Sequence, residues 1–159
     1  MPTFTTSSLN GRSPAETFAF IVDLSRWPMF RGYGPLPGIV EATLEQGPWG
    51  PGARVRVRNT DGSVHHEVVR TWEPVRRYAI VMELVPPASH LMAAIEEEVV
   101  LRPEDGGTRV LRTFRTVPRG WWTAPMVWLL TRFFLRPAVE AHDRAVAAAL
   151  GSAKGRRGA

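Results

Sequence analysis

Short extended runs fill residues 38–117, and this pattern limits the fold more than any other feature of the chain. The runs are rich in Val, Ile, Thr and aromatic residues, and clusters of turn-forming residues separate them. The clusters are Gln46–Gly52, Thr60–Ser63, Glu73–Arg76, Pro86–His90 and Pro103–Gly107. Such clusters mark turns, so the segment is predicted to form six strands with short connections. Short connections join antiparallel neighbours, which predicts a meander.

The segments on either side of the meander complete an α+β pattern. Residues Thr3–Leu9 are predicted to form a first strand, and an N-cap serine followed by proline opens a helix over Pro14–Asp23. A second short helical turn is predicted to end at Phe30. From Gly120 to Leu150 the apolar spacing is helical, and Pro137 is expected to kink or split that helix.

Length and composition exclude several protein classes. A chain of 159 residues suits one domain, which we expect at residues 1–150, followed by a disordered basic tail at 151–159. The absence of cysteine excludes disulfides, thiolate metal sites and a cysteine nucleophile. The tail carries three of the five net positive charges, and no dense basic stripe precedes it, so no nucleic-acid partner is expected. The start of the chain lacks a secretory pattern, which predicts a cytoplasmic location.

The most apolar stretch, Trp121–Leu135, is too short for a membrane span and contains Arg132. We expect it to be buried or to cover a pocket. Contact with a membrane surface is the less favoured alternative, and a monomer or a homodimer is equally compatible with the sequence.

Turn lengths predict which side chains face the interior. If Asp61-Gly62 is a two-residue hairpin turn, the inward residues are Val55, Val57, His66 and Val68. The residues of that hairpin predicted to face water are Arg54, Arg56, Arg58, His65 and Glu67. The next strand is expected to turn Tyr78, Ile80, Met82 and Leu84 inward. In the last hairpin the inward set is Ile95, Glu97, Val99, Leu101, Val110, Arg112 and Phe114.

Three polar side chains, His66, Glu97 and Arg112, therefore fall on a face that should be apolar. Two interpretations remain open. One is a structural ion pair between Glu97 and Arg112, or a strand register displaced by one residue. The other is a partly hydrated cavity with polar groups directed at a ligand.

Alternating connections bring three segments to one end of the sheet: Thr60–Ser63, Pro86–His90 and Val117–Trp122. That end would present His90, Leu91, Trp121 and Trp122 at the rim of a cavity. The first half of the C-terminal helix is apolar all round, which predicts that it is enclosed or roofs the cavity. His142 and Asp143, adjacent on the helix, are predicted to lie on the surface.

Several segments resemble one superfamily. They are Ser13–Glu16, Asp23–Pro28, Ile39–Glu41, Val68–Tyr78 and Gly106–Val110. Over about residues 3–150 the chain resembles the START-like helix-grip superfamily (SRPBCC), most closely its bacterial polyketide cyclase/dehydrase and lipid-transport branch. The resemblance implies a curved seven-stranded antiparallel sheet around a long C-terminal helix, with two short helices between strands 1 and 2. It also implies a hydrophobic cavity for lipids, steroids or polyketides, and in some members cyclisation or dehydration without a cofactor. It identifies no catalytic residues.

The first functional hypothesis is a binding protein for a small hydrophobic or aromatic molecule. The residues expected to contact that ligand are Trp27, Phe30, Val57, Val68, Tyr78, Ile80, Met82, Ile95, Val99, Phe114, Trp121, Trp122, Val127, Leu130 and Phe134.

The second hypothesis is a cofactor-independent cyclase/dehydrase. His66 would be the acid/base, Arg112 with Tyr33 would hold an enolate oxygen, and Glu97 would orient Arg112. A third hypothesis is a module that contacts membranes or proteins through Trp121–Leu135. No metal site is expected, because His65 and His66 point to opposite faces of a strand.

Overall fold

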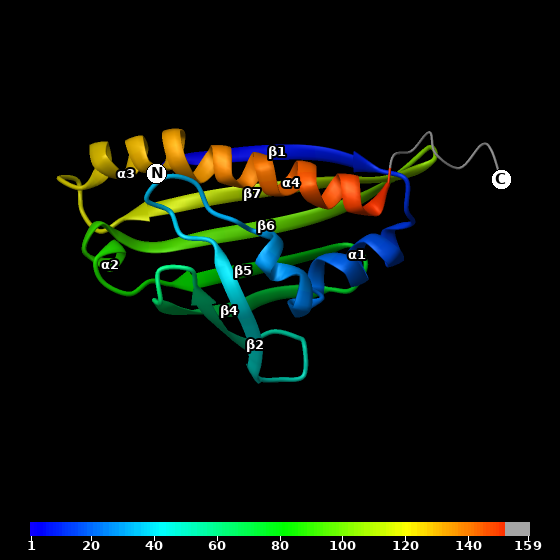
Figure 1. The fold of residues 1–159 in the computed structure, drawn as a ribbon, viewed down its shortest axis with the longest axis horizontal. Coiled ribbons are helices and arrows are strands. Elements are labelled where there is room, and N and C mark those ends of the chain that lie inside the picture. The colour runs from blue at the N-terminus through cyan, green and yellow to red at the C-terminus, as the bar shows by residue number, and fades with distance from the viewer. Residues whose placement is uncertain (152–159) are drawn as a thin grey trace.

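The computed structural model describes residues 1–151, which form one seven-stranded antiparallel sheet with helices packed against it (Figure 1). The strands are β1 (Thr3–Asn10), β2 (Ile39–Gln46), β3 (Arg54–Asn59), β4 (Val64–Glu73), β5 (Arg77–Glu83), β6 (Met92–Glu104) and β7 (Gly107–Pro118). Their order in the sheet is β1-β7-β6-β5-β4-β3-β2, so β2 to β7 form the predicted six-stranded meander. The predicted basic tail lies, apart from Gly151, outside the described residues.

The helices follow the predicted order, with one addition. They are α1 (Pro14–Val22), the 3-10 helix η1 (Leu24–Met29), α2 (Ala88–Leu91), α3 (Ala124–Leu130), the π-helical turn η2 (Thr131–Leu135) and α4 (Arg136–Leu150). A capping box starts α1, where Ser13 Oγ accepts from the Glu16 amide and Glu16 accepts from the Ser13 amide. The wide turn η2 ends two residues before Pro137, whose ring and missing N–H disfavour regular α-helix in the preceding turn.

Figure 1 shows how these helices are distributed along the sheet. The α3–η2–α4 helix runs along its length, α2 and α3 lie at one end, and α1 lies toward the other. The three connections predicted to share an end do so: the β7–α3 turn bonds to α2 through Arg119 and Leu91 (2.9 Å), and the order of the antiparallel strands places the β3–β4 turn at the same end. None of the helices within residues 1–151 combines the length and the apolar character that crossing a bilayer requires.

The last hairpin has the predicted register. Glu97 lies opposite Phe114 and Val99 opposite Arg112, so one face of β6 and β7 carries the predicted inward set. Val99 and Phe114 are buried on that face.

The predicted register of the β3–β4 hairpin is wrong by one residue. The loop has three residues, not two: the Asn59 amide donates to the Ser63 carbonyl (2.8 Å), and Gly62 takes a positive φ of 85° at the third loop position. Val57 therefore pairs with His65, and Val55 with Glu67. A shift of one residue reverses every side chain of a strand.

This reversal exchanges the two faces of β4. His65 and Glu67 lie on the inner face, and His66 and Val68 lie on the outer one. Glu67 is buried although it was predicted to face water.

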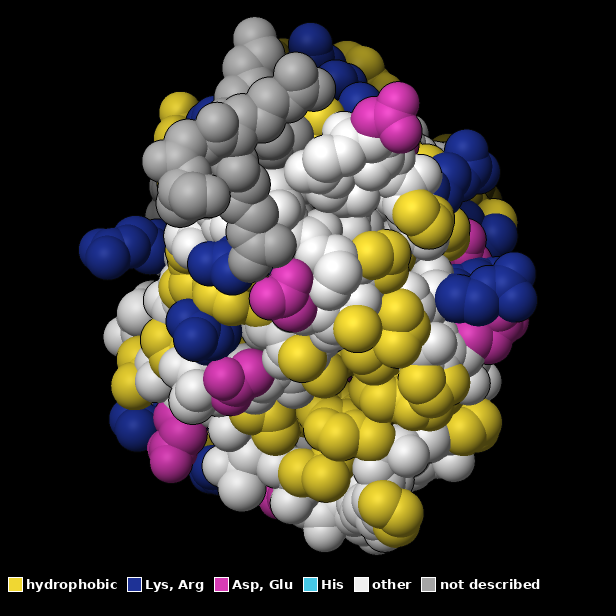
Figure 2. Space-filling model, turned by 90° about the vertical axis from the view of Figure 1, so that its right-hand side faces the viewer, with side chains coloured by type: hydrophobic (Ala, Val, Ile, Leu, Met, Phe, Trp, Pro, Cys, Tyr) yellow, Lys and Arg dark blue, Asp and Glu magenta, His cyan; other side chains and the backbone are white. Residues whose placement is uncertain are grey.

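The apolar side chains gather in two clusters. The first contains Phe18 and Val99, with Trp49 and Trp72 packed against it, their rings stacked 5.1 Å apart. Figure 2 shows hydrophobic side chains gathered on the side of the molecule toward which α1 lies. The second cluster contains Phe114 and Val127, and it joins the C-terminal helices to β1, β6 and β7.

Of the two alternatives predicted for the first half of the C-terminal helix, complete enclosure is wrong, whereas Leu130 and Phe134 do line a cavity. Val127 is buried, but Trp128, Leu129 and Phe133 are exposed, as is Trp121 before the helix. The helix packs one narrow stripe on the sheet and turns its bulkiest side chains to solvent.

Candidate functional site

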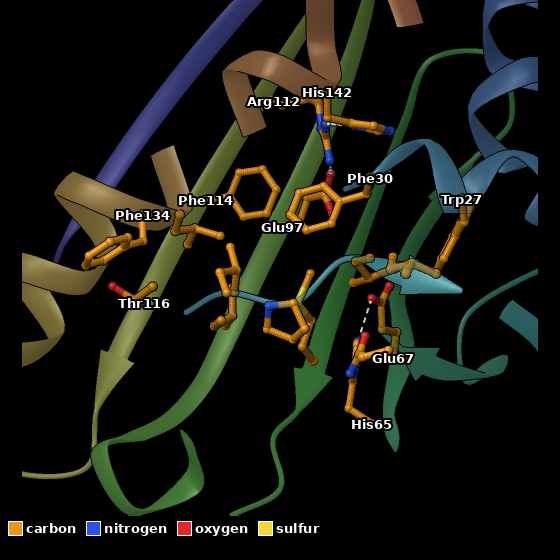
Figure 3. A pocket seen from close by; sticks show the side chains of 18 of the residues that line it. Trp27, Phe30, His65, Glu67, Glu97, Arg112, Phe114, Thr116, Phe134 and His142 are labelled. Carbon is orange, nitrogen blue, oxygen red and sulfur yellow. Dashed lines mark hydrogen bonds and ion pairs between the residues drawn. The ribbon is translucent and has the colours of Figure 1, made fainter. Parts of the chain in front are cut away.

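A cavity of about 410 Å³ lies between the inner face of the sheet and the helices (Figure 3). Its walls are mainly apolar, with polar side chains at two places. The predicted ligand-contact residues that line it are Trp27, Phe30, Tyr78, Ile80, Met82, Ile95, Phe114, Leu130 and Phe134. The size is in the range of pockets that take a drug-sized molecule.

Six predicted ligand-contact residues do not line the cavity, for three different reasons. Val57, Val99 and Val127 are completely buried in the packed core, where no space adjoins them. Val68 lies on the outer face because of the corrected register. Trp121 and Trp122 are exposed by 88% and 62% and point away from the interior.

Two residues predicted for catalysis also lie elsewhere. His66 is on the outer face, where its Nε2 lies 3.1 Å from Glu45 Oε2. Tyr33 is half exposed and packs against the ring of Phe134, with 6.3 Å between centroids, without lining the cavity. The other two, Glu97 and Arg112, line it.

The first polar group of the cavity is centred on Arg112. Its Nη2 lies 2.6 Å from Glu97 Oε1. Its Nη1 donates to Asp143 Oδ1 (2.6 Å) and to His142 Nδ1 (2.9 Å). Asp143 also accepts from Thr6 on β1. The prediction that His142 and Asp143 are surface residues is wrong, because α4 lies close enough to the sheet for both to reach Arg112.

Burial and charge determine the protonation of this group. Burial would lower the pKa of Arg112, but Glu97 and Asp143 outweigh it and hold that pKa above its ordinary value. Burial raises the pKa of Glu97, and Arg112 offsets only part of the effect. Burial, aided by the charge of Arg112, lowers the pKa of His142 to about 4. His142 is therefore neutral at pH 7, with Nδ1 accepting from Arg112 and the proton on Nε2.

Lowering the pH from 7 to about 5 is expected to destabilise the protein through His142 by about 2 kcal/mol. His142 has a folded-state pKa of about 4 against 6.5 unfolded, so the unfolded chain binds the proton first as the pH falls. This contribution is complete above pH 6.5 and is lost toward pH 4. Urea unfolding at both pH values should show a smaller loss for His142→Asn than for wild type. Equal losses in both proteins would contradict the assignment, and exposed His90→Asn is the control.

The second polar group lies on β3 and β4. Asn59 Nδ2 lies 3.0 Å from His65 Nδ1, and His65 Nε2 lies 3.1 Å from Glu67 Oε1. Because Asn59 is a donor here, His65 Nδ1 accepts and Nε2 carries the proton toward Glu67. Figure 3 shows Glu67 and His65 apart from Arg112 and His142, with Phe30 between the two groups.

The Tyr78 hydroxyl adds one more polar atom to the cavity wall. Burial raises the pKa of its hydroxyl, and the charge of Glu97 adds to the effect, so the phenol stays protonated. Within residues 1–151 this hydroxyl has no hydrogen-bond partner. It is therefore a free donor for a ligand oxygen.

Sequence reasoning missed Asn59, His65, Glu67, His142 and Asp143. One signal for the first three was present: Thr60-Asp61-Gly62 also suits a three-residue loop with glycine in the third place. For the other two no local signal exists, because their burial depends on the distance between α4 and the sheet.

Comparisons with known proteins agree on the fold. XoxI from Bacillus cereus has a TM-score of 0.68 at 17% identity, covering 94% of this chain and 96% of its own. Ara h 8.0201 has a TM-score of 0.62 at 15% identity, covering 92% and 98%. The di-domain ARO/CYC StfQ of the steffimycin biosynthetic pathway has a TM-score of 0.69 at 13% identity. This chain matches 50% of StfQ over 93% of its own length. No curated protein matches.

These likenesses show a helix-grip fold, as the sequence resemblance implied. The family model for polyketide cyclase / dehydrase and lipid transport matches residues 1–151. Since that match spans nearly the whole chain, the protein belongs to the polyketide cyclase / dehydrase and lipid transport family.

Proposed function

We propose that this protein binds one small hydrophobic or aromatic molecule, such as a lipid, steroid or polyketide, in the cavity between sheet and C-terminal helix. The observation that carries the proposal is the cavity of about 410 Å³, whose apolar walls have polar atoms at two separate places. Apolar walls supply affinity and a few placed polar groups supply orientation. The predicted cytoplasmic location stays a prediction.

The polar atoms indicate what the ligand carries. Near Arg112, the Nε2–H of His142 and the hydroxyl of Tyr78 are neutral donors without a partner within the described residues. At the other place, Glu67 has one carboxylate oxygen that bonds to no described residue. The arrangement fits an apolar body with a carbonyl oxygen at one end and a hydroxyl at the other.

Filling the cavity is expected to weaken ligand binding by about tenfold or more, equivalent to about 1.4 kcal/mol or more. Met82 and Ile95 lie opposite each other on β5 and β6, and both line the cavity. The variant Met82→Trp/Ile95→Trp should place two indoles in the space that a ligand needs. The measurement is a fluorescence titration with the uncharged apolar dye N-phenylnaphthylamine.

The control is Val81→Trp, which adds the same side chain to the outer face of β5. Circular dichroism and urea unfolding should confirm that each variant is folded. Wild-type protein and Val81→Trp should bind one dye with the same affinity. If the folded double variant binds the dye as tightly as wild type, the cavity is not the binding site.

A second candidate function is a dehydration or aldol-type cyclisation, and the Asn59–His65–Glu67 group favours it. Glu67 is an almost completely buried carboxylate at the cavity wall, and His65 holds one of its two oxygens. The other oxygen is free to take a proton from a carbon next to a carbonyl. We propose this group in place of His66, which lies outside the cavity.

A dehydration would proceed in balanced steps. Glu67 removes the proton on carbon, and the electron pair moves onto the carbonyl oxygen, where the Tyr78 hydroxyl donates, a group on which the charge of Glu67 acts. The enolate then expels the β-hydroxyl as its C–O bond breaks, and Glu67 returns the proton so that water leaves. Arg112 does not contact the reacting atoms in this scheme, since its guanidinium already bonds to Glu97, Asp143 and His142. Mass spectrometry of a β-hydroxy ketone incubated with the protein tests for the loss of one water.

A further inference from the structure

The α3–η2 segment exposes large apolar side chains and buries threonines, the opposite of an ordinary surface helix. Its buried positions recur every four residues, and two of them, Thr123 and Thr131, are threonines. Thr131 Oγ1 donates to the Val127 carbonyl (2.7 Å) and lies 2.8 Å from Thr116 Oγ1 on β7. Thr131 thus bonds to the sheet, whereas the Thr123 hydroxyl bonds to Gly120 in the turn before the helix.

The opposite side of the same segment is almost entirely apolar. We call it the tryptophan face; its exposed large apolar residues are Trp121 and Trp122, in the turn before α3, and Met126, Trp128, Leu129 and Phe133. Trp128 and Phe133 meet edge to face, with 6.3 Å between ring centroids. Exposed large apolar side chains gathered in one short segment mark an interaction surface.

The charged residues within the stretch of sequence that carries the tryptophan face have one sign. No Asp or Glu occurs between Asp105 and Glu140. Arg119 and Arg132 are exposed and, within residues 1–151, have no carboxylate partner. Arg119 Nε donates to the Ser89 carbonyl (2.6 Å), and the guanidinium of Arg132 lies 5.8 Å from the Phe133 ring centroid. The other arginines of this stretch, Arg109, Arg112, Arg115 and Arg136, all pair with carboxylates.

The tryptophan face adjoins the cavity. Leu130 and Phe134, on the same segment, line the cavity, as do Pro87 and Leu91 around α2. Both α2 and α3 lie at the same end of the sheet (Figure 1). A surface that covers the tryptophan face would therefore lie next to this part of the cavity wall.

We propose that the tryptophan face docks the protein on the surface of an anionic lipid bilayer. Indole rings prefer the boundary between headgroups and acyl chains, where Met, Leu and Phe reach the apolar layer. Unpaired arginines without neighbouring carboxylates complement anionic headgroups. A two-fold dimer through this face would instead place two sets of these cations at one interface. The docking itself does not depend on the proposed ligand, although it would allow an apolar ligand to pass between bilayer and cavity.

Sedimentation with vesicles tests the proposal. Full-length protein should sediment with phosphatidylcholine vesicles that contain phosphatidylglycerol, and less with phosphatidylcholine alone or at high salt. Trp121→Ala/Trp122→Ala should lower the partition coefficient about tenfold or more, since these side chains carry the contact. Arg119→Gln/Arg132→Gln should lose the preference for anionic vesicles. Leu9→Ala, an exposed apolar residue on β1, is the control and should bind as wild type does.

The variants change exposed residues, so dye binding in the cavity should be unaffected, which separates this test from that of the proposed function. Failure of wild-type protein to sediment with anionic vesicles would overturn the proposal. Sedimentation that the tryptophan variant retains would also overturn it. The proposal would also be overturned if analytical ultracentrifugation showed a homodimer of the wild-type protein that Trp121→Ala/Trp122→Ala abolishes, because a second copy would then cover the face.

Discussion

Replacing Arg112 by methionine is expected to lower the free energy of unfolding by about 3–5 kcal/mol at neutral pH. The change would leave Glu97 and Asp143 buried without a counter-charge, and their side chains are only 5% and 10% exposed. Methionine has a similar length and adds no polar group, so lost packing contributes little. Urea unfolding followed by circular dichroism measures the effect. The loss should shrink at lower pH, where Glu97, whose pKa burial raises, takes up a proton.

The matched control for this prediction is Arg115→Met on the same strand. Arg115 pairs with Glu96 on the exposed face of the sheet, so its loss should cost less than about 1 kcal/mol. If both variants are destabilised by the same small amount, Arg112 is not the centre of a buried charge network.

The second large effect concerns catalysis. If the protein dehydrates a β-hydroxy ketone, Glu67→Gln should lower kcat by about 10²–10⁴-fold, because the amide cannot accept the proton. The amide keeps the shape of the carboxylate and can still bond to His65, so affinity for N-phenylnaphthylamine should change less than about threefold. Turnover is measured by mass spectrometry of the released product.

His66→Ala is the control for Glu67→Gln, since it changes an ionisable residue of the same strand outside the cavity. Its kcat should equal that of wild type. A loss of turnover in His66→Ala with none in Glu67→Gln would restore the role that the sequence predicted for His66. Equal loss of dye affinity and kcat in Glu67→Gln would make Glu67 a ligand-binding group only.

The sheet was largely predictable because its turns have distinctive sequences. In the β6–β7 hairpin, Asp105-Gly106 and the alternation of apolar residues agree, so register, inward face and the Glu97–Arg112 pair all followed. The α+β order and the meander followed from turn spacing alone.

The β3–β4 hairpin shows where such reasoning fails. Polarity favours Val68 inside and Glu67 outside, but the Gly62 turn imposes the opposite register. Burying Glu67 and His65 costs solvation that Asn59 and the mutual bond offset only in part. Disagreement between local pattern and fold is expected at functional sites, and this one lies in the cavity wall.

The exposed side of the C-terminal helix was not predictable for a different reason. Between Met126 and Leu135 the helix has apolar residues on all its sides. The spacing of apolar residues therefore cannot distinguish the buried side from the exposed one. Only packing on β7, where Thr131 meets Thr116, selects the orientation. The burial of His142 and Asp143 likewise depends on how closely α4 approaches the sheet.

Methyl-resolved NMR during a titration with N-phenylnaphthylamine tests the central claim, a cavity that takes an apolar ligand, most directly. The methyl signals of Ile80, Met82 and Ile95 should shift together and saturate at one dye per protein. Those of Val57, in the packed core, should move little. Shifts confined to Met126 and Leu129, or no saturable change, would contradict a ligand-binding interior.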